Sequence, residues 1–189
     1  MSIVIDAAPE KEPITLEFTK SQLNVYHDSD DTLLQSYIGV ARNLVEKRLS
    51  RALITQTWDW SFRSFSDEMF IPLAPLQSIT SVSYIDENGA TQVLSSAVYD
   101  VDVGVEPGIV RLAYSQSWPS VRDVANAVTI EFVSGYGLNP NNVPFVIRQA
   151  LVLYVGHLYQ NREATSMLTI KEVPMAFESL MDSVQWTYL

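Results

Sequence analysis

The feature that most constrains the fold is a change of hydrophobic period at residues 51–62, RALITQTWDWSF. Upstream of it, apolar residues recur at intervals of three and four, as on one face of an amphipathic helix. They are Leu33, Leu34, Tyr37, Ile38, Ala41, Leu44, Val45 and Leu49. Downstream the period becomes two, and Trp58, Trp60 and Phe62 alternate with polar residues. A helix of about 20 residues, about 30 Å long, must therefore be followed almost directly by a β-strand.

The period-two pattern continues from Leu53 to about Tyr136, where short runs of β-forming residues are separated by turn signals such as Asn88-Gly89. It predicts an antiparallel lobe of six or seven strands. Helical patterns lie on both sides of it, at Leu16–Leu23 after the N-cap Thr15, at Pro144–Arg162, and after Pro174. We predict an α+β fold, a helical bundle with an inserted antiparallel β lobe.

The predicted organisation has four parts. Residues 1–14 form an N-terminal arm, 15–52 and 140–164 the helical bundle core, 53–139 the β lobe, and 165–189 a C-terminal docking segment. The arm lacks a helical period, and either a frayed terminus or an arm that docks on a neighbour fits it. It has neither a basic n-region nor a long apolar h-region, and no run of about 18 apolar residues occurs. We therefore expect neither a secretory signal nor a membrane helix, and synthesis in the cytoplasm.

The charge balance is acidic, with 22 Asp and Glu against 12 Lys and Arg, a formal net charge of -10. Proteins that grip nucleic acid neutralise phosphates with cations, so this balance excludes tight DNA wrapping. It does not exclude a protein that DNA merely passes. The absence of cysteine excludes disulfides, thiolate catalysis and cysteine metal sites.

No catalytic or metal-binding pattern is found. His27 and His157 belong to no metal-ligand spacing, and no glycine-rich phosphate loop or nucleophile elbow occurs. The cluster Asp28, Asp30 and Asp31 resembles the start of a calcium loop, but Leu33 stands where such a loop requires glycine. Helix capping accounts for the three carboxylates. We predict a protein that is not an enzyme, with no catalytic residues, no metal and no cofactor.

The aromatic strand admits two interpretations. Trp58, Trp60 and Phe62 point to the same side of a strand, where they could form a platform for a carbohydrate or a host receptor. They could equally form a packing wall between the lobe and the helices or between subunits. Packing is favoured because a single-strand stacking face also needs a basic groove, and Asp59 lies between the two tryptophans.

An ordered series of motifs resembles a known family. The series includes ITLEFTKSQLNV, RALITQTW, PLQSITSV, VTIEFVSGYG and GHLYQNREA, and it covers about residues 13–165. It resembles the tailed-phage head–tail connector (adaptor) proteins of the gp6-like or phiE125 gp8-like type.

The resemblance implies a fold and a role. Connectors of this type have a helical-bundle core with a β insertion in longer members. They form a homo-oligomeric ring, expected to be a dodecamer, beneath the portal protein of the virion, after assembly in the host cytoplasm. The ring extends the DNA channel, without sequence-specific DNA binding, and carries the next neck or tail ring protein, a stopper or tail terminator.

The C-terminal segment has an amphipathic pattern that continues into an apolar end. We expect it to dock on the portal or on a neighbouring subunit, and packing back onto its own bundle is the alternative. The residues concerned are Met175, Phe177, Leu180, Met181, Val184, Trp186, Tyr188 and Leu189.

Overall fold

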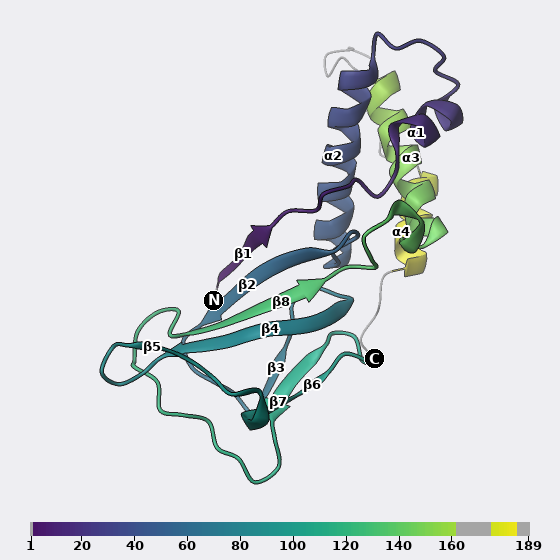
Figure 1. Ribbon diagram of the computed structural model, residues 1–189. Helices are drawn as coiled ribbons and strands as arrows, with labels where there is room; N and C mark the ends of the chain where they lie inside the picture. Colours follow the sequence, from purple (N-terminus) through teal and green to yellow (C-terminus); the bar gives the residue numbers. More distant parts are fainter. Residues whose placement is uncertain (1, 162–174, 185–189) are drawn as a thin grey trace. The chain divides into compact units, whose positions relative to one another are not determined.

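The computed structural model describes residues 2–161 and 175–184 and has the predicted α+β fold (Figure 1). The chain divides into two compact units. The helical unit comprises Glu10–Ile54 and Gly137–Leu189, and the β unit comprises Met1–Pro9 and Thr55–Tyr136. The β unit is thus inserted into the sequence of the helical unit, which is completed by segments from both sides of the insertion.

The helical unit contains four α-helices in its described residues: α1 (Leu16–Leu23), α2 (Asp31–Leu49), α3 (Phe145–Gln160) and α4 (Met175–Val184). Thr15 caps α1, because its Oγ1 accepts a hydrogen bond of 3.1 Å from the Phe18 N–H. The long helices α2 and α3 pack against each other, as expected for segments that flank an insertion. Pro144, the predicted first residue of this helix, is the N-cap residue of α3, so the helix begins one position later than predicted.

The apolar stripe predicted for α2 is divided in the structure. Leu34, Ile38, Ala41 and Val45 are buried in the unit. Leu33 and Tyr37 are only half-buried, and Leu44 is 38% exposed. The sequence pattern is wider than the face that the other helices cover, so α2 carries apolar residues beyond its own core.

The β unit contains two antiparallel sheets around one core. One sheet has the strand order β1-β2-β8-β4-β5, and the other has the order β3-β7-β6. The strands are β1 (Ser2–Ala7), β2 (Gln56–Phe62), β3 (Glu68–Phe70), β4 (Leu76–Ile85), β5 (Thr91–Val93), β6 (Tyr99–Asp102), β7 (Ile109–Leu112) and β8 (Val128–Ser134). Strands β2 to β8 correspond to the seven period-two runs of the sequence. The core is contributed by both sheets and includes Trp60, Met69, Val82, Val110 and Phe132.

The N-terminal residues differ from the expected arm over residues 1–14. Ser2–Ala7 form β1, which pairs antiparallel with β2 at the edge of the larger sheet, with Val4 opposite Asp59. The chain enters the helical unit from Glu10 onward. The backbone N–H and C=O groups of this segment therefore form hydrogen bonds with β2 of the same chain. The periodicity of the side chains alone does not reveal this strand pairing.

Candidate functional site

The three aromatic residues of β2 point into the core of the β unit. Trp60 and Phe62 are buried, with ring centroids 4.6 Å apart, and Trp58 packs against the same core while half-buried. Their neighbours on the central strand β8, Val128, Ile130 and Phe132, lie directly opposite them in register. The aromatic side of β2 is thus a packing wall.

This burial bears on both interpretations of the aromatic strand. Within the β unit the aromatic side chains pack in a core to which both sheets contribute. Trp60 is only 5% exposed, so it offers no ring face for a sugar to stack on. The geometry gives no support to a carbohydrate- or host-binding platform made of Trp58 and Trp60.

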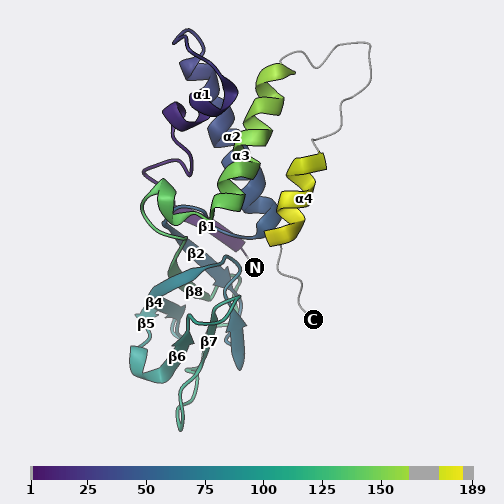
Figure 2. The same ribbon diagram turned by 90° about the vertical axis from the view of Figure 1, so that its right-hand side faces the viewer.

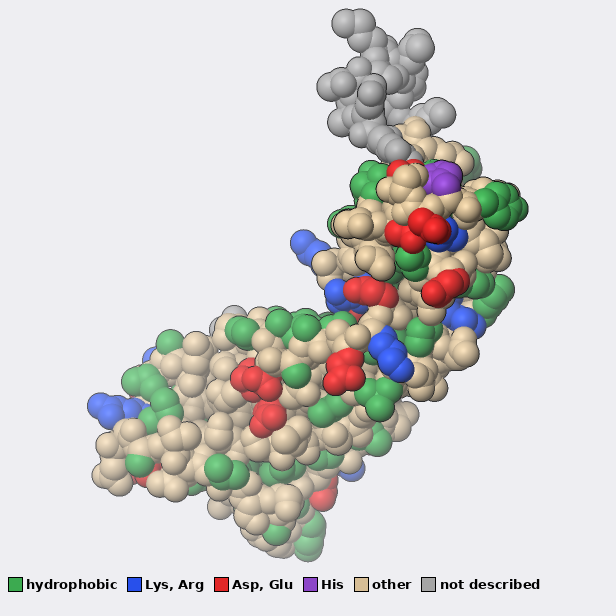
Figure 3. Space-filling view, turned by 45° about the horizontal axis from the view of Figure 1, so that its top comes forward, with side chains coloured by type: hydrophobic (Ala, Val, Ile, Leu, Met, Phe, Trp, Pro, Cys, Tyr) green, Lys and Arg blue, Asp and Glu red, His purple; other side chains and the backbone are tan. Residues whose placement is uncertain are grey.

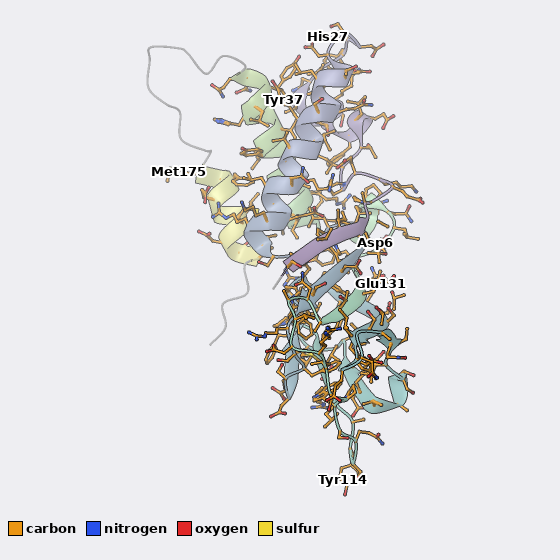
Figure 4. All side chains as sticks on the ribbon, turned by 90° about the vertical axis from the view of Figure 1, so that its left-hand side faces the viewer. Asp6, His27, Tyr37, Tyr114, Glu131 and Met175 are labelled. Carbon is orange, nitrogen blue, oxygen red and sulfur yellow. The ribbon has the colours of Figure 1, made fainter. Side chains whose placement is uncertain are left out.

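The opposite face of the same sheet carries a group of carboxylates. Asp59 on β2 lies opposite Glu131 on β8 in the strand register, and Asp6 comes from β1 (Figure 4). Burial raises the pKa of Asp59, and the negative charges of Asp6 and Glu131 raise it further. Within residues 2–161 and 175–184 these three carboxylates form no ion pair, although the Ser81 hydroxyl donates a 3.1 Å hydrogen bond to Glu131. Acidic side chains form a visible group on the β unit in Figure 3.

Sequence reasoning missed this acidic face, although its signal is present. Asp59 stands between Trp58 and Trp60, and Glu131 stands between Ile130 and Phe132. In a strand with period two, residues between core positions point to the other side. Placing the two carboxylates beside each other needed the pairing of β2 with β8, which joins residues about seventy positions apart in the sequence.

The C-terminal helix α4 packs onto its own helical unit. Phe177 and Met181 are 1% and 0% exposed, and the Phe177 ring centroid lies 5.2 Å from that of Tyr154 on α3. Arg48 of α2 forms ion pairs with Glu178 and Asp182, the latter at 3.2 Å, and its guanidinium lies 5.8 Å from the centroid of the Phe177 ring. The hydrogen bond from Arg48 lowers the pKa of Glu178. Phe177 and Met181 are therefore already engaged within the chain.

The other predicted docking residues differ in accessibility. Met175 is 86% exposed, whereas Leu180 and Val184 are half-buried (Figure 4). Trp186, Tyr188 and Leu189 lie outside the described residues. The side chains on α4 that remain available for a partner are thus those on the side away from Phe177 and Met181.

The acidic residues before α2 have partners within the protein. Asp28 and Asp31 each form a 2.7 Å ion pair with Lys20 of α1, and Asp30 accepts a 2.6 Å hydrogen bond from the Tyr159 hydroxyl of α3. The expected side-chain capping is wrong for Asp30, which is the N-cap residue but makes no capping hydrogen bond. These carboxylates tie α1, α2 and α3 together, and in the described part of the chain no group of three or more His, Cys, Asp or Glu side chains is placed to hold a metal ion.

One open cavity of about 640 Å³ lies in the helical unit. Its apolar lining includes Ile14, Leu16 and Ile38. Its two charged lining residues are engaged elsewhere, since Lys11 donates a 3.0 Å hydrogen bond to Asn139 and Glu12 forms a 2.9 Å ion pair with Arg42. The cavity therefore brings together no nucleophile, base or free charge from which chemistry could be built.

Comparison with known proteins gives one family. Residues 13–106 match the family described as "Phage gp6-like head-tail connector protein". The match confirms the resemblance to the gp6-like head–tail connectors. It begins where the sequence motifs begin and includes α1, α2 and the first strands after them. This family is one of structural connectors and not of enzymes, in agreement with the prediction for this chain.

Three solved structures share the fold. A chain of "Neck of empty GTA particle computed with C6 symmetry" has a TM-score of 0.81 at 19% identity. A chain of "Virion of native gene transfer agent (GTA) particle" has a TM-score of 0.80 at 18%, and one of "Neck of native GTA particle computed with C12 symmetry" has 0.75 at 20%. Each match covers 100% of this chain and 97% of the other. At such identities the likeness shows the fold.

A search of curated proteins gives no match. In the described residues of this connector-like chain, no helix is both long and apolar enough to cross a membrane.

We predict that Asp59→Asn stabilises the β unit at pH 7 by about 0.5–1 kcal/mol, because it removes like charges that face each other across strands. The raised pKa means that the folded state binds the Asp59 proton more tightly than the unfolded state, so stability from this group falls as pH rises through the raised pKa. The advantage of the variant should therefore shrink as pH is lowered toward the ordinary value of 3.8. Urea unfolding at several pH values measures it. Asp67→Asn, in the exposed loop before β3, is the control, and an equal gain there would contradict the explanation.

We predict that Phe177→Ala lowers the free energy of unfolding of the helical unit by about 3 kcal/mol, because it empties a buried aromatic site. Met175→Ala on the same helix should change it by less than about 0.5 kcal/mol, because Met175 is exposed. Chemical denaturation of the two variants makes the comparison. Similar small effects for both would show that α4 does not contribute to the unit's core.

Proposed function

We propose that this protein is a structural head–tail connector (adaptor) of a tailed bacteriophage or a phage-like particle. In this role it forms a ring under the portal, extends the DNA channel and joins the capsid to the tail. The observation that carries the proposal is the family match over residues 13–106. The shared fold with chains of neck and virion structures, over the whole length of this chain, supports it.

The ring is proposed to contain twelve copies. Two of the structures that share the fold are described as necks computed with C6 and C12 symmetry, which supports a cyclic arrangement for this chain as well. In a cyclic ring each subunit uses two different surfaces, one for each neighbour. The chain therefore needs two interaction surfaces in addition to those that contact the portal and the next neck or tail protein.

The charge of the protein suits a channel for DNA. The formal charge of -10, together with the carboxylates of Asp6, Asp59 and Glu131, disfavours binding to phosphates. DNA can then pass the ring without sequence-specific binding. Such a protein would act in the virion, at the head–tail interface, after assembly in the host cytoplasm.

The C-terminal segment is the proposed contact with the portal or a neighbouring subunit. Phe177 and Met181 hold α4 on its own unit, so residues 185–189, with Trp186, Tyr188 and Leu189, are the part we assign to docking. An apolar segment that follows an anchored helix is suited to enter a groove on a partner.

The purified full chain should form a ring, alone or when mixed with the portal of the same particle. We expect a mass twelve times that of the 21.2 kDa chain and a ring with twelve-fold symmetry in electron micrographs. Native mass spectrometry and microscopy make the test. A chain that stays monomeric and does not associate with the portal would contradict the proposed function.

Deletion of residues 185–189 should leave a folded protein that still forms rings, because α4 and its buried residues remain. We expect the truncated protein to lose binding to portal-bearing capsids. A capsid pull-down with the full chain as reference measures the loss, and Val93→Ser, at an exposed position on β5, is the control. Undiminished binding by the truncated protein would remove residues 185–189 from the docking surface.

A further inference from the structure

The helix α2 carries a second apolar stripe beside its buried one. Leu33, Tyr37, Val40 and Leu44 follow intervals of four, three and four, as do the buried Leu34, Ile38, Ala41 and Val45 one position later. Val40 is 50% and Leu44 38% exposed. Residues on the same side between Leu33 and Leu44 include Ser36 and Asn43, and none is charged. We call this surface the α2 face.

A second open apolar surface lies on α3. Val146 and Leu153, seven residues apart and therefore on one side of the helix, are 36% and 37% exposed. Other sides of α3 are covered within the unit: α4 contacts it through Phe177 and Tyr154, and α1 approaches Gly156 through Leu23. The open side, which we call the α3 face, also carries Gln149, His157 and Gln160 and no Asp, Glu, Lys or Arg between Gln149 and Gln160.

The two faces lie on two neighbouring helices of the helical unit. In Figure 2 α3 lies in front of α2, and in Figure 4, seen from the opposite direction, α2 lies in front. The two helices pack on each other through their buried stripes, and the α2 face lies about 100° around α2 from its buried stripe, beside the contact with α3.

We propose that the α2 face of one copy packs on the α3 face of the next copy, as the head-to-tail contact of the ring. This inference rests on the proposed function, because a ring requires two unlike surfaces on each subunit. A contact between two α2 faces would instead close a dimer and stop growth. Two unlike apolar faces on one unit are the arrangement that continues from copy to copy.

The charge distribution favours another copy as the occupant of each face. Two chains that each carry a formal charge of -10 can meet closely only where neither presents carboxylates. Both faces meet this condition, and depletion of charge with retained apolar residues is typical of the core of a protein interface. DNA would require cations on these faces, and they have none between Leu33 and Leu44 or between Val146 and Leu153 on the open sides.

The natural absence of cysteine allows a direct test by cross-linking. A chain with both Val40→Cys and Leu153→Cys should give a ladder of covalent multimers when its rings are treated with a short bis-maleimide, because each subunit then joins two neighbours. A link between the two positions of one chain would give no multimer, so the ladder reports contacts between chains. Val40→Cys alone and Leu153→Cys alone should give no multimers. The pair Val93→Cys and Leu153→Cys is the control for random collisions, since Val93 is 74% exposed on β5.

A charge placed on the α2 face should prevent ring formation without unfolding the chain. Val40→Glu buries an unpaired carboxylate only in the ring, so we expect at least about a ten-fold rise in the concentration needed for assembly. Val93→Glu, at an exposed valine of the β unit, should assemble normally. Circular dichroism establishes that both variants fold, and mass measurement gives the assembly.

The outcomes separate this inference from the proposed function. Rings without a ladder from the double-cysteine chain, or rings unaffected by Val40→Glu, would overturn the assignment of the two faces and leave the connector function standing. Dimers from Val40→Cys alone would show that two α2 faces meet in a symmetric contact, which would overturn the proposed contact between the α2 and α3 faces. Failure of the unmodified chain to form rings, with and without portal, would overturn both.

Discussion

The contact between α2 and α3 is the interaction on which the rest of the structure depends. The two helices come from segments separated by the whole β unit, and each buries an apolar stripe in the other's direction, including Leu34 and Ile38 on α2 and Leu151 and Val155 on α3. Each buried Leu, Ile or Val side chain contributes about 1.5–3 kcal/mol. This contact closes the chain around the insertion, so that the β unit can hold its own core without contributing to the helical one.

The same contact also decides what is left for partners. Because α2 and α3 use only one stripe each for their mutual contact, other apolar residues of both helices remain exposed, among them Val40 on α2 and Leu153 on α3. The ion pairs of Arg48 with Glu178 and Asp182 then hold α4 beside them, and Phe177 completes the core. The helical unit thus has a core of its own and two different exposed apolar surfaces, the α2 face and the α3 face. A repeating ring requires two different surfaces on each subunit.

The larger sheet of the β unit has one apolar face, which packs in the core, and one face that carries carboxylates. Trp58, Trp60 and Phe62 face the core, while Asp59 and Glu131 face outward on adjacent strands. Strand alternation places the acidic group on the side away from the core, where burial raises the pKa of Asp59 and repulsion from Asp6 and Glu131 raises it further. For a connector, that repulsion would be useful, since the same field opposes DNA binding.

The sequence by itself determined the fold class, a lobe of six or seven strands and the long helices, because hydrophobic period and turn residues are local properties. It also indicated the resemblance to the head–tail connectors and contained no catalytic pattern. Only the tertiary structure decided which half of the α2 stripe is buried, that residues 2–7 pair with β2, that Arg48 binds α4, and that Asp59 meets Glu131. Each of these depends on a contact between residues distant in the sequence, and no local pattern specifies which of several apolar or charged partners a residue will meet.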